Sequence, residues 1–232
     1  MILPHTFDEK NHVYQVPGHF VLSTSDIISL NGLSDYGAIP KATLDHASWR
    51  GTQLHKAIQF FEEDAEAPEM PEEVEPYFRG YLKFKIDYDF EPIGALEKQI
   101  VYVHSGTEQP VGCTIDLRGL VKGHPYILDA KTTAPWPVDS QCKDKKRKCL
   151  AWRLQVASYS EATDVDMEWL LRASNAVPDC TGKVGKGIVQ VTKDGNYEFH
   201  DFSRAVDDDL LWDGAVRLAM AKLANGYQLE RR

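Results

Sequence analysis

The chain has 232 residues, of which 43% are hydrophobic and 26% are charged, and its formal net charge at pH 7 is −9. This composition is ordinary for a globular protein with a sizeable core. The negative charge excludes a histone-like protein that coats nucleic acid through bulk positive charge. Apolar runs are far too short to span a bilayer, so we expect no membrane contact.

The N-terminus and the cysteines indicate the compartment. The first ten residues contain no cationic stretch that leads into an apolar one, which argues against a secretory signal. The four cysteines, at positions 113, 142, 149 and 180, include no CxxC pair. We therefore expect unpaired thiols and a cytoplasmic protein, in a bacterial host or encoded by a phage.

The first third of the chain predicts a hairpin and then helices. Strand-forming residues flank a turn at Pro17-Gly18, and Ser23 or Ser25 can cap a short helix that stops at Asn31-Gly32. Apolar residues then recur at helical spacing. The elements expected here are strands 12–16 and 20–22 and helices 26–30, 43–64 and a further one after Pro71 that runs through Lys85.

From residue 95 the pattern changes to strands, and the remaining elements alternate between the two types. We expect strands at 96–103, 111–121 and 126–130, a helix at 146–162, a hairpin of 187–192 with 196–202, and a helix at 204–224. The stretch 163–178 is ambiguous between helix and loop. This order predicts an α/β (α+β) fold, with a central mixed β-sheet flanked by helices and an N-terminal hairpin. We expect one domain over 1–232, with its core at about 43–202.

Two of these strands carry the polar residues that suggest chemistry. Successive strand residues point to opposite faces, so Cys113, Ile115 and Leu117 are expected to share one face. A turn centred on Gly123-His124 would place Asp116 opposite Lys131, and Arg118 opposite Asp129, on the other face; a three-residue turn would change this register.

Two carboxylates beside a lysine need an explanation. Bringing two negative charges to about 4 Å costs roughly 4 kcal/mol at an effective dielectric near 20. A divalent cation removes this cost, and oxygen ligands suit Mg²⁺ or Mn²⁺. The lysine, Lys131, can orient or deprotonate a water molecule. A pair of surface salt bridges is the alternative reading of Asp116, Asp129 and Lys131.

The context of these residues resembles a known family. The segments 112–117 (GCTIDL) and 126–133 (YILDAKTT) resemble the G-x-x-D-h…h-h-D-x-K-T core of PD-(D/E)xK nucleases of the RecB-like branch. The segment 51–55 (GTQLH) resembles the family's GxxxH motif, and 155–159 (QVASY) its QxxxY motif. His12, Tyr14 and the segment 23–25 (STS) resemble the opening of phage-type and mitochondrial genome-maintenance exonucleases.

The resemblance implies a restriction-endonuclease-like core and a role for each matched residue. His55, Asp116, Asp129, Glu97 and the backbone carbonyl of Ala130 would bind metal. Lys131 would activate water, with Asp116 and Asp129 also catalytic. Gln155 and Tyr159, four residues apart on one helix face, would complete the catalytic set. A strand-edge glutamate and a core tyrosine are the plainer readings of Glu97 and Tyr159.

A basic run follows the strands and lies where a phosphate chain would be held. The residues expected to contact DNA are Lys143, Lys145, Lys146, Arg147, Lys148, Trp152 and Arg153. A solvated surface is the alternative reading of this run. Because no cysteine precedes Cys113, we expect no iron–sulfur cluster of the kind that some relatives carry.

The predicted function is metal-dependent hydrolysis of DNA phosphodiester bonds, as an exonuclease acting in recombination or repair. The resemblance also implies a single-strand annealing protein as a partner. An endonuclease of the same fold, for end trimming, restriction or CRISPR adaptation, is the second reading. A catalytically silent nucleic-acid-binding module is the third, and it would be marked by a broken Asp…Asp-x-Lys set.

Overall fold

The computed structural model describes residues 1–9, 11–34, 39–64, 66, 68–133, 143–177, 184–205 and 207–229, without the side chains of 143–145. The fold is mixed α/β, as the sequence predicts. The strands are β1 (Thr6–Asp8), β2 (Val13–Gln15), β3 (Leu22–Ser23), β4 (Glu91–Pro92), β5 (Lys98–Val103), β6 (Pro110–Ile115), β7 (Leu117–Val121), β8 (His124–Thr132), β9 (Gly185–Val191) and β10 (Tyr197–Asp201). The helices are α1 (Thr24–Leu30), α2 (Lys41–Asp64), α3 (Glu75–Asp87), α4 (Lys143–Asp164), α5 (Met167–Ala176) and α6 (Asp208–Ala224).

The strands form three sheets. The central sheet has five strands in the order β10-β9-β8-β7-β4, in which β8 and β9 are parallel and the other neighbours antiparallel. A second sheet has the order β3-β6-β5, with β3 parallel to β6. Only Asp116 separates β6 from β7, so the chain passes directly from one sheet into the other.

The N-terminal hairpin is present, but its strands differ from the predicted ones. β1 pairs with β2, whereas the segment expected as the second strand contributes Leu22–Ser23 to a parallel pairing with β6. The turn at Pro17-Gly18 exists only as an isolated bridge between Val16 and His19. α1 confirms the predicted capping: Ser23 accepts from the backbone of Asp26, whose carboxylate accepts from the backbone of Ser23.

The register of β7 with β8 differs by two residues from the predicted one. Lys122 and Gly123 both have positive φ, 50° and 77°, and form a two-residue turn that pairs Val121 with His124. Arg118 therefore lies opposite Ile127, not opposite Asp129. Because the shift is an even number, Asp129 and Lys131 keep the expected face.

The interruption at Asp116 corrects a second prediction. Ile115 packs in a cluster with α1, α4 and α6, whereas Leu117 packs in a different cluster with α2 and α3. The two residues would share a face in a continuous strand. The chain therefore changes sides at Asp116, and this carboxylate lies where the two sheets meet.

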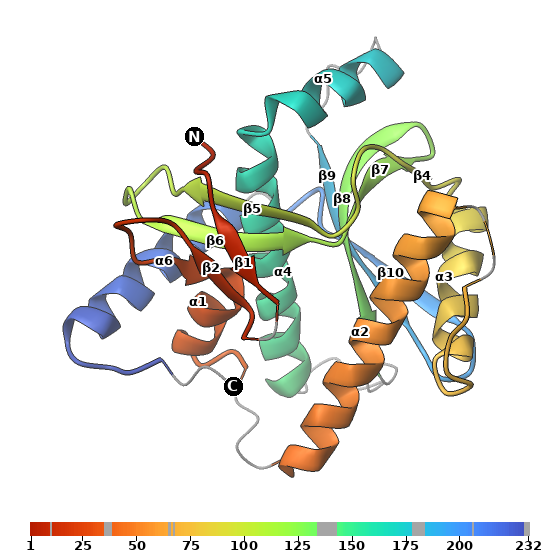
Figure 1. Ribbon diagram of the computed structural model, residues 1–232, viewed down its shortest axis with the longest axis horizontal. Helices are drawn as coiled ribbons and strands as arrows, with labels where there is room; N and C mark the ends of the chain where they lie inside the picture. The colour runs from red at the N-terminus through yellow and green to blue at the C-terminus, as the bar shows by residue number, and fades with distance from the viewer. Residues whose placement is uncertain are drawn as a thin grey trace.

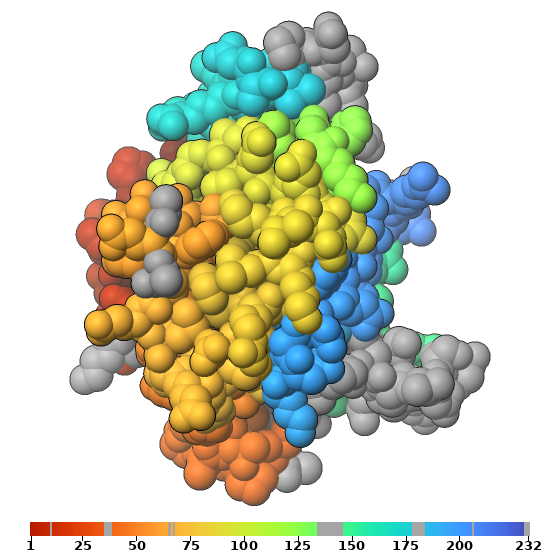
Figure 2. Space-filling view, turned by 90° about the vertical axis from the view of Figure 1, so that its right-hand side faces the viewer, coloured from red at the N-terminus to blue at the C-terminus, as the bar shows by residue number. Residues whose placement is uncertain are grey.

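The helices cover the sheets from opposite sides (Figure 1). α1, α4 and α6 cover one core cluster, and α2 and α3 cover the other. α3 contacts β9 and β10, and Figure 2 shows this yellow segment at the centre of one face of the molecule, beside the blue strands. α5 accounts for the ambiguous stretch near residue 170. In the described part of the chain, no helix has the length and apolar character needed to cross a bilayer.

Candidate active site

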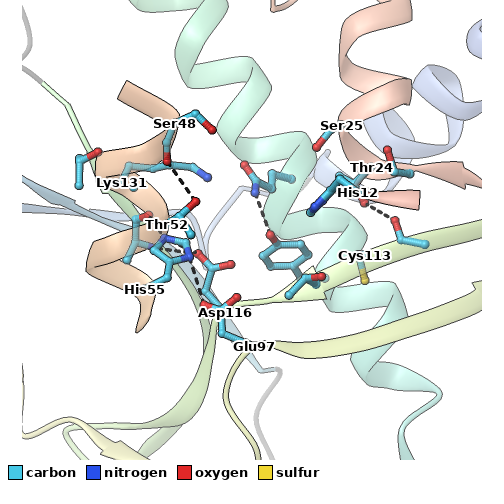
Figure 3. A pocket seen from close by; sticks show the side chains of 18 of the residues that line it. His12, Thr24, Ser25, Ser48, Thr52, His55, Glu97, Cys113, Asp116 and Lys131 are labelled. Carbon is cyan, nitrogen blue, oxygen red and sulfur yellow. Dashed lines mark hydrogen bonds and ion pairs between the residues drawn. The ribbon is translucent and has the colours of Figure 1, made fainter. Parts of the chain in front are cut away.

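A pocket of about 420 Å³ opens beside Asp116 (Figure 3). One wall is the first half of α2, which contributes Ser48, Thr52 and His55. Gln155 and Tyr159 of α4 also line the pocket, and so does Lys131 at the end of β8. The structure therefore brings the GxxxH helix, the strand pair and the QxxxY helix to one cavity.

A cluster of three side chains could hold a metal ion. The ligand atoms of His55, Glu97 and Asp116 all lie within 4.8 Å of one another. His55 Nδ1 is 3.1 Å from Glu97 Oε1, and His55 Nε2 is 3.5 Å from Asp116 Oδ2. Three chain segments far apart in sequence supply these groups, so only the tertiary fold assembles them.

The backbone fixes the two carboxylates of this cluster. Glu97 has a positive φ of 48° and lies just before β5, not within it as expected. Its N–H donates to the carbonyl oxygen of Asp116 at 3.1 Å. Asp116 Oδ2 in turn accepts from the N–H of Ala130 at 3.1 Å. A non-glycine residue in this backbone region is strained, which is common where a side chain must be aimed at a site.

A second cluster of polar side chains surrounds Asp129, which is fully buried. Gln155 Nε2 donates to its Oδ1 at 2.6 Å, and Tyr159 Oη donates to the same oxygen at 3.3 Å. Lys131 Nζ lies 2.9 Å from Oδ1 and 2.8 Å from Oδ2. Oδ2 is nevertheless buried without a hydrogen bond of good geometry. Such an oxygen retains capacity for one more ligand.

The surroundings of His55 favour its protonated, imidazolium form. Its Nδ1 faces the Glu97 carboxylate, and its Nε2 is 2.9 Å from the carbonyl oxygen of Ala130. Both partners only accept, so both ring nitrogens must donate. Burial lowers the pKa of His55, but the carboxylates of Asp116 and Glu97 outweigh it and raise the pKa to about 10.

The two aspartates are hard to ionise in the absence of a metal. Burial raises the pKa of Asp116, although the charge of His55 opposes the shift. Burial and then the charge of Asp116 raise the pKa of Asp129 to about 7, although Lys131 opposes the shift. The ionised forms of these buried acids are therefore stabilised by the positive charges nearby, those of His55 and Lys131, and a bound metal ion would add to them.

The donor atoms fit a hard divalent cation. His55, Glu97 and Asp116 offer one nitrogen and two carboxylates, which suit Mn²⁺ or Mg²⁺. The carbonyl of Ala130 lies beside His55 and is within reach of the same cluster. The Asp129 carboxylate turns toward α4 and Lys131, and it is not part of the converging group among the described residues.

The basic residues predicted to contact DNA lie at the start of α4. The side chains of Lys143 and Lys145 lie outside the described residues. Lys146, Arg147 and Lys148 follow on α4, with Lys146 exposed. Burial, and then the charge of Lys131, lower the pKa of Lys148, so this side chain approaches the site.

The other two residues predicted to contact DNA, Trp152 and Arg153, both contact the protein itself. Trp152 is 5% exposed and packs with Val156 and Ile188, so its ring has no face for a base. Arg153 donates from Nε to Asp208 at 2.8 Å and lies 2.7 Å from the same oxygen through a terminal nitrogen. It links α4 to α6. The burial of Trp152 therefore argues against a contact with DNA, whereas Arg153, whose side chain is 28% exposed, keeps its DNA contact as a prediction.

Several pocket residues were missed from the sequence. Thr52 and Ser48 lie one and two turns before His55 on the same helix face, which the 3- and 4-residue spacing could have indicated. His12, Thr24 and Ser25 also line the pocket. No local pattern places these N-terminal residues beside α2. The parallel pairing of β3 with β6 brings Thr24 and Ser25 there, and the hydrogen bond between Tyr14 and Thr114 anchors the strand that follows His12.

Comparisons with known proteins add little. No protein-family model matches the chain, and no curated protein matches it either. Among solved structures, a chain described as "Crystal structure of SSO0001" superposes with a TM-score of 0.43 at 10% sequence identity. The match covers 93% of this chain and 81% of that one.

Proposed function

We propose that this protein is a metal-dependent nuclease that hydrolyses DNA phosphodiester bonds, as an exonuclease of the PD-(D/E)xK type. The observation that carries the proposal is the convergence of two groups at one pocket. His55, Glu97 and Asp116 form a cluster that could hold a cation, and beside it the Lys131 ammonium forms an ion pair with Asp129. Charge of both signs gathered at a polar cavity is typical of a catalytic site.

A divalent ion held by His55, Glu97 and Asp116, with Asp129 and the Ala130 carbonyl as further candidates, would polarise a phosphoryl oxygen and lower the pKa of a bound water. The protein's own residues supply the rest. Asp129 keeps the Lys131 ammonium within 2.9 Å of its carboxylate, so this ammonium group is already positioned in the site before substrate binds. That ammonium can orient the attacking water and stabilise the developing charge on the phosphate.

Gln155 and Tyr159 act through Asp129. Their hydrogen bonds fix the carboxylate from the α4 side, and Gln155 also donates to Tyr159 Oη at 2.8 Å. They are positioning residues in this proposal. Hydrolysis joins the oxygen of water to phosphorus and breaks the bond to one ribose oxygen, so the products are a phosphate end and a hydroxyl end.

The test is digestion of linear and closed circular DNA with Mg²⁺ or Mn²⁺. We expect linear DNA to be degraded, and Asp129→Ala or Lys131→Ala to abolish cleavage while DNA binding persists. Lys193→Ala is a matched control, because this lysine is exposed in the β9–β10 turn. Wild-type rates in both site variants would show that the site is assigned wrongly.

Closed circular DNA separates the two nuclease readings. An exonuclease needs a free end and leaves the circle intact, whereas an endonuclease opens it. Binding of either DNA without any cleavage, at any divalent ion tested, would favour the catalytically silent module.

A further inference from the structure

The pocket extends beyond the cluster of His55, Glu97 and Asp116 to a second end. His12, Ser23, Thr24 and Ser25 line this part, which we call the N-terminal end of the pocket. Figure 3 shows His12, Thr24 and Ser25 on the opposite side of the pocket from His55 and Lys131. The proposed hydrolysis gives these residues no role, although they form one wall of its cavity.

The ring of His12 is held in place by aromatic neighbours that cover part of it, and the rest of the residue is exposed. It packs edge-on against Phe7, with centroids 5.1 Å apart at 83°, and against Tyr14, at 6.1 Å and 80°. The residue has a positive φ of 52°, so the backbone is strained to present it. An exposed aromatic ring fixed at a cavity wall is a surface on which a nucleobase can stack.

The charges at this end disfavour a phosphate group. The only lysine or arginine among the described lining residues is Lys131, at the metal end. Asp26 lies close enough that its charge raises the pKa of His12, but burial outweighs this and lowers the pKa overall. Asp26 also occupies the N–H of Ser23. A terminal phosphate at this end would therefore be desolvated without a fixed cation to balance its charge.

The hydroxyl groups suit an uncharged ligand. Thr24 Oγ1 is 2.7 Å from Ser158 Oγ and is satisfied within the protein. Ser25 is exposed, and its hydroxyl makes no hydrogen bond with any residue in the described ranges. A serine hydroxyl can both donate to and accept from a sugar hydroxyl.

We propose that the N-terminal end of the pocket binds the uncharged terminal nucleoside of a single DNA strand, with its base against His12 and a sugar hydroxyl near Ser25. This inference rests on the proposed nuclease function. The whole pocket, at about 420 Å³, is near the lower limit of small-molecule sites, which is about 300 Å³. It therefore has room for about one nucleotide.

The test compares single-stranded oligonucleotides that end in a hydroxyl or a phosphate, at the 5′ or the 3′ end, with the opposite end blocked. With Mn²⁺, we expect kcat/KM to be about tenfold higher for a hydroxyl at the end that enters the pocket. Equal or faster cleavage of both phosphate-ended strands would overturn this inference alone. Absence of cleavage for every strand would overturn the nuclease proposal together with it.

Substitution of His12 provides a second measurement. Asn tolerates positive φ and removes the ring, so His12→Asn should fold and raise KM for the hydroxyl-ended strand about tenfold. His19→Ala is the matched control, since His19 is exposed in the neighbouring loop and does not line the pocket. Unchanged KM and unchanged end preference in His12→Asn would overturn the assignment.

Discussion

Binding of a divalent ion should release one proton from His55. Both ring nitrogens donate hydrogen bonds in the structure, and the pKa of this side chain is raised to about 10. A ring nitrogen must lose its proton before it can bind a metal ion. The ion would therefore replace the imidazolium as the charge that balances Asp116 and Glu97.

The free energy needed to deprotonate His55 follows from the difference between its pKa and the pH of the solution. At about pH 8.5, Asp129, with a pKa of about 7, is already ionised, whereas His55 is still protonated. Removal of a proton from a group with a pKa of about 10 then costs about 2 kcal/mol. Because each pH unit changes this cost by about 1.4 kcal/mol, apparent Mn²⁺ affinity should rise about tenfold per unit between roughly pH 8 and 9.5.

Calorimetric titration of the DNA-free protein with Mn²⁺, in two buffers of different ionisation enthalpy, measures this proton directly. We expect close to one proton per bound ion in the wild type. His55→Gln retains a polar side chain without a titrating group and should release none, with an affinity that no longer varies with pH. Binding of Mn²⁺ to the wild type without proton release would refute the reasoning.

Three further predictions concern stability in the absence of metal, each measured by thermal unfolding with circular dichroism. Gly51→Ala should raise Tm by about 2 °C, because alanine favours a helix and the added Cβ meets nothing closer than 3.8 Å. Gly112→Ala should lower Tm, because the added Cβ would lie 2.4 Å from the ring of Tyr14. A change of Tm in the same direction for both variants would contradict this packing. Asp208→Ala should cost about 3 kcal/mol, or roughly 10 °C, since this buried carboxylate is the shared partner of two cations. Asp129→Asn should raise Tm by several degrees at about pH 8 although it abolishes cleavage. The raised pKa of Asp129 means that the fold favours the protonated acid, so the gain in Tm should shrink as pH falls from about 7 towards 4. A gain in Tm that does not depend on pH would count against this explanation.

Local sequence determined most of the elements and the chemistry that they carry. Gln155 and Tyr159, four residues apart, face one side of α4 because the helical period requires it, and they meet Asp129 as expected. Asp129 and Lys131 share a strand face for the corresponding reason in a strand. Ser23, one of the two caps that the sequence offered, likewise precedes the start of α1.

The geometry of the site depended on contacts that no local pattern encodes. The positive φ of Lys122 set the register of β7 against β8, and the change of face at Asp116 follows from the meeting of two sheets. Glu97 reaches His55 because its strained backbone is anchored to Asp116, and Ser23 and Thr24 reach the pocket through the parallel pairing of β3 with β6. Residue types and periods fix local conformation, whereas the packing of distant segments decides which side chains meet.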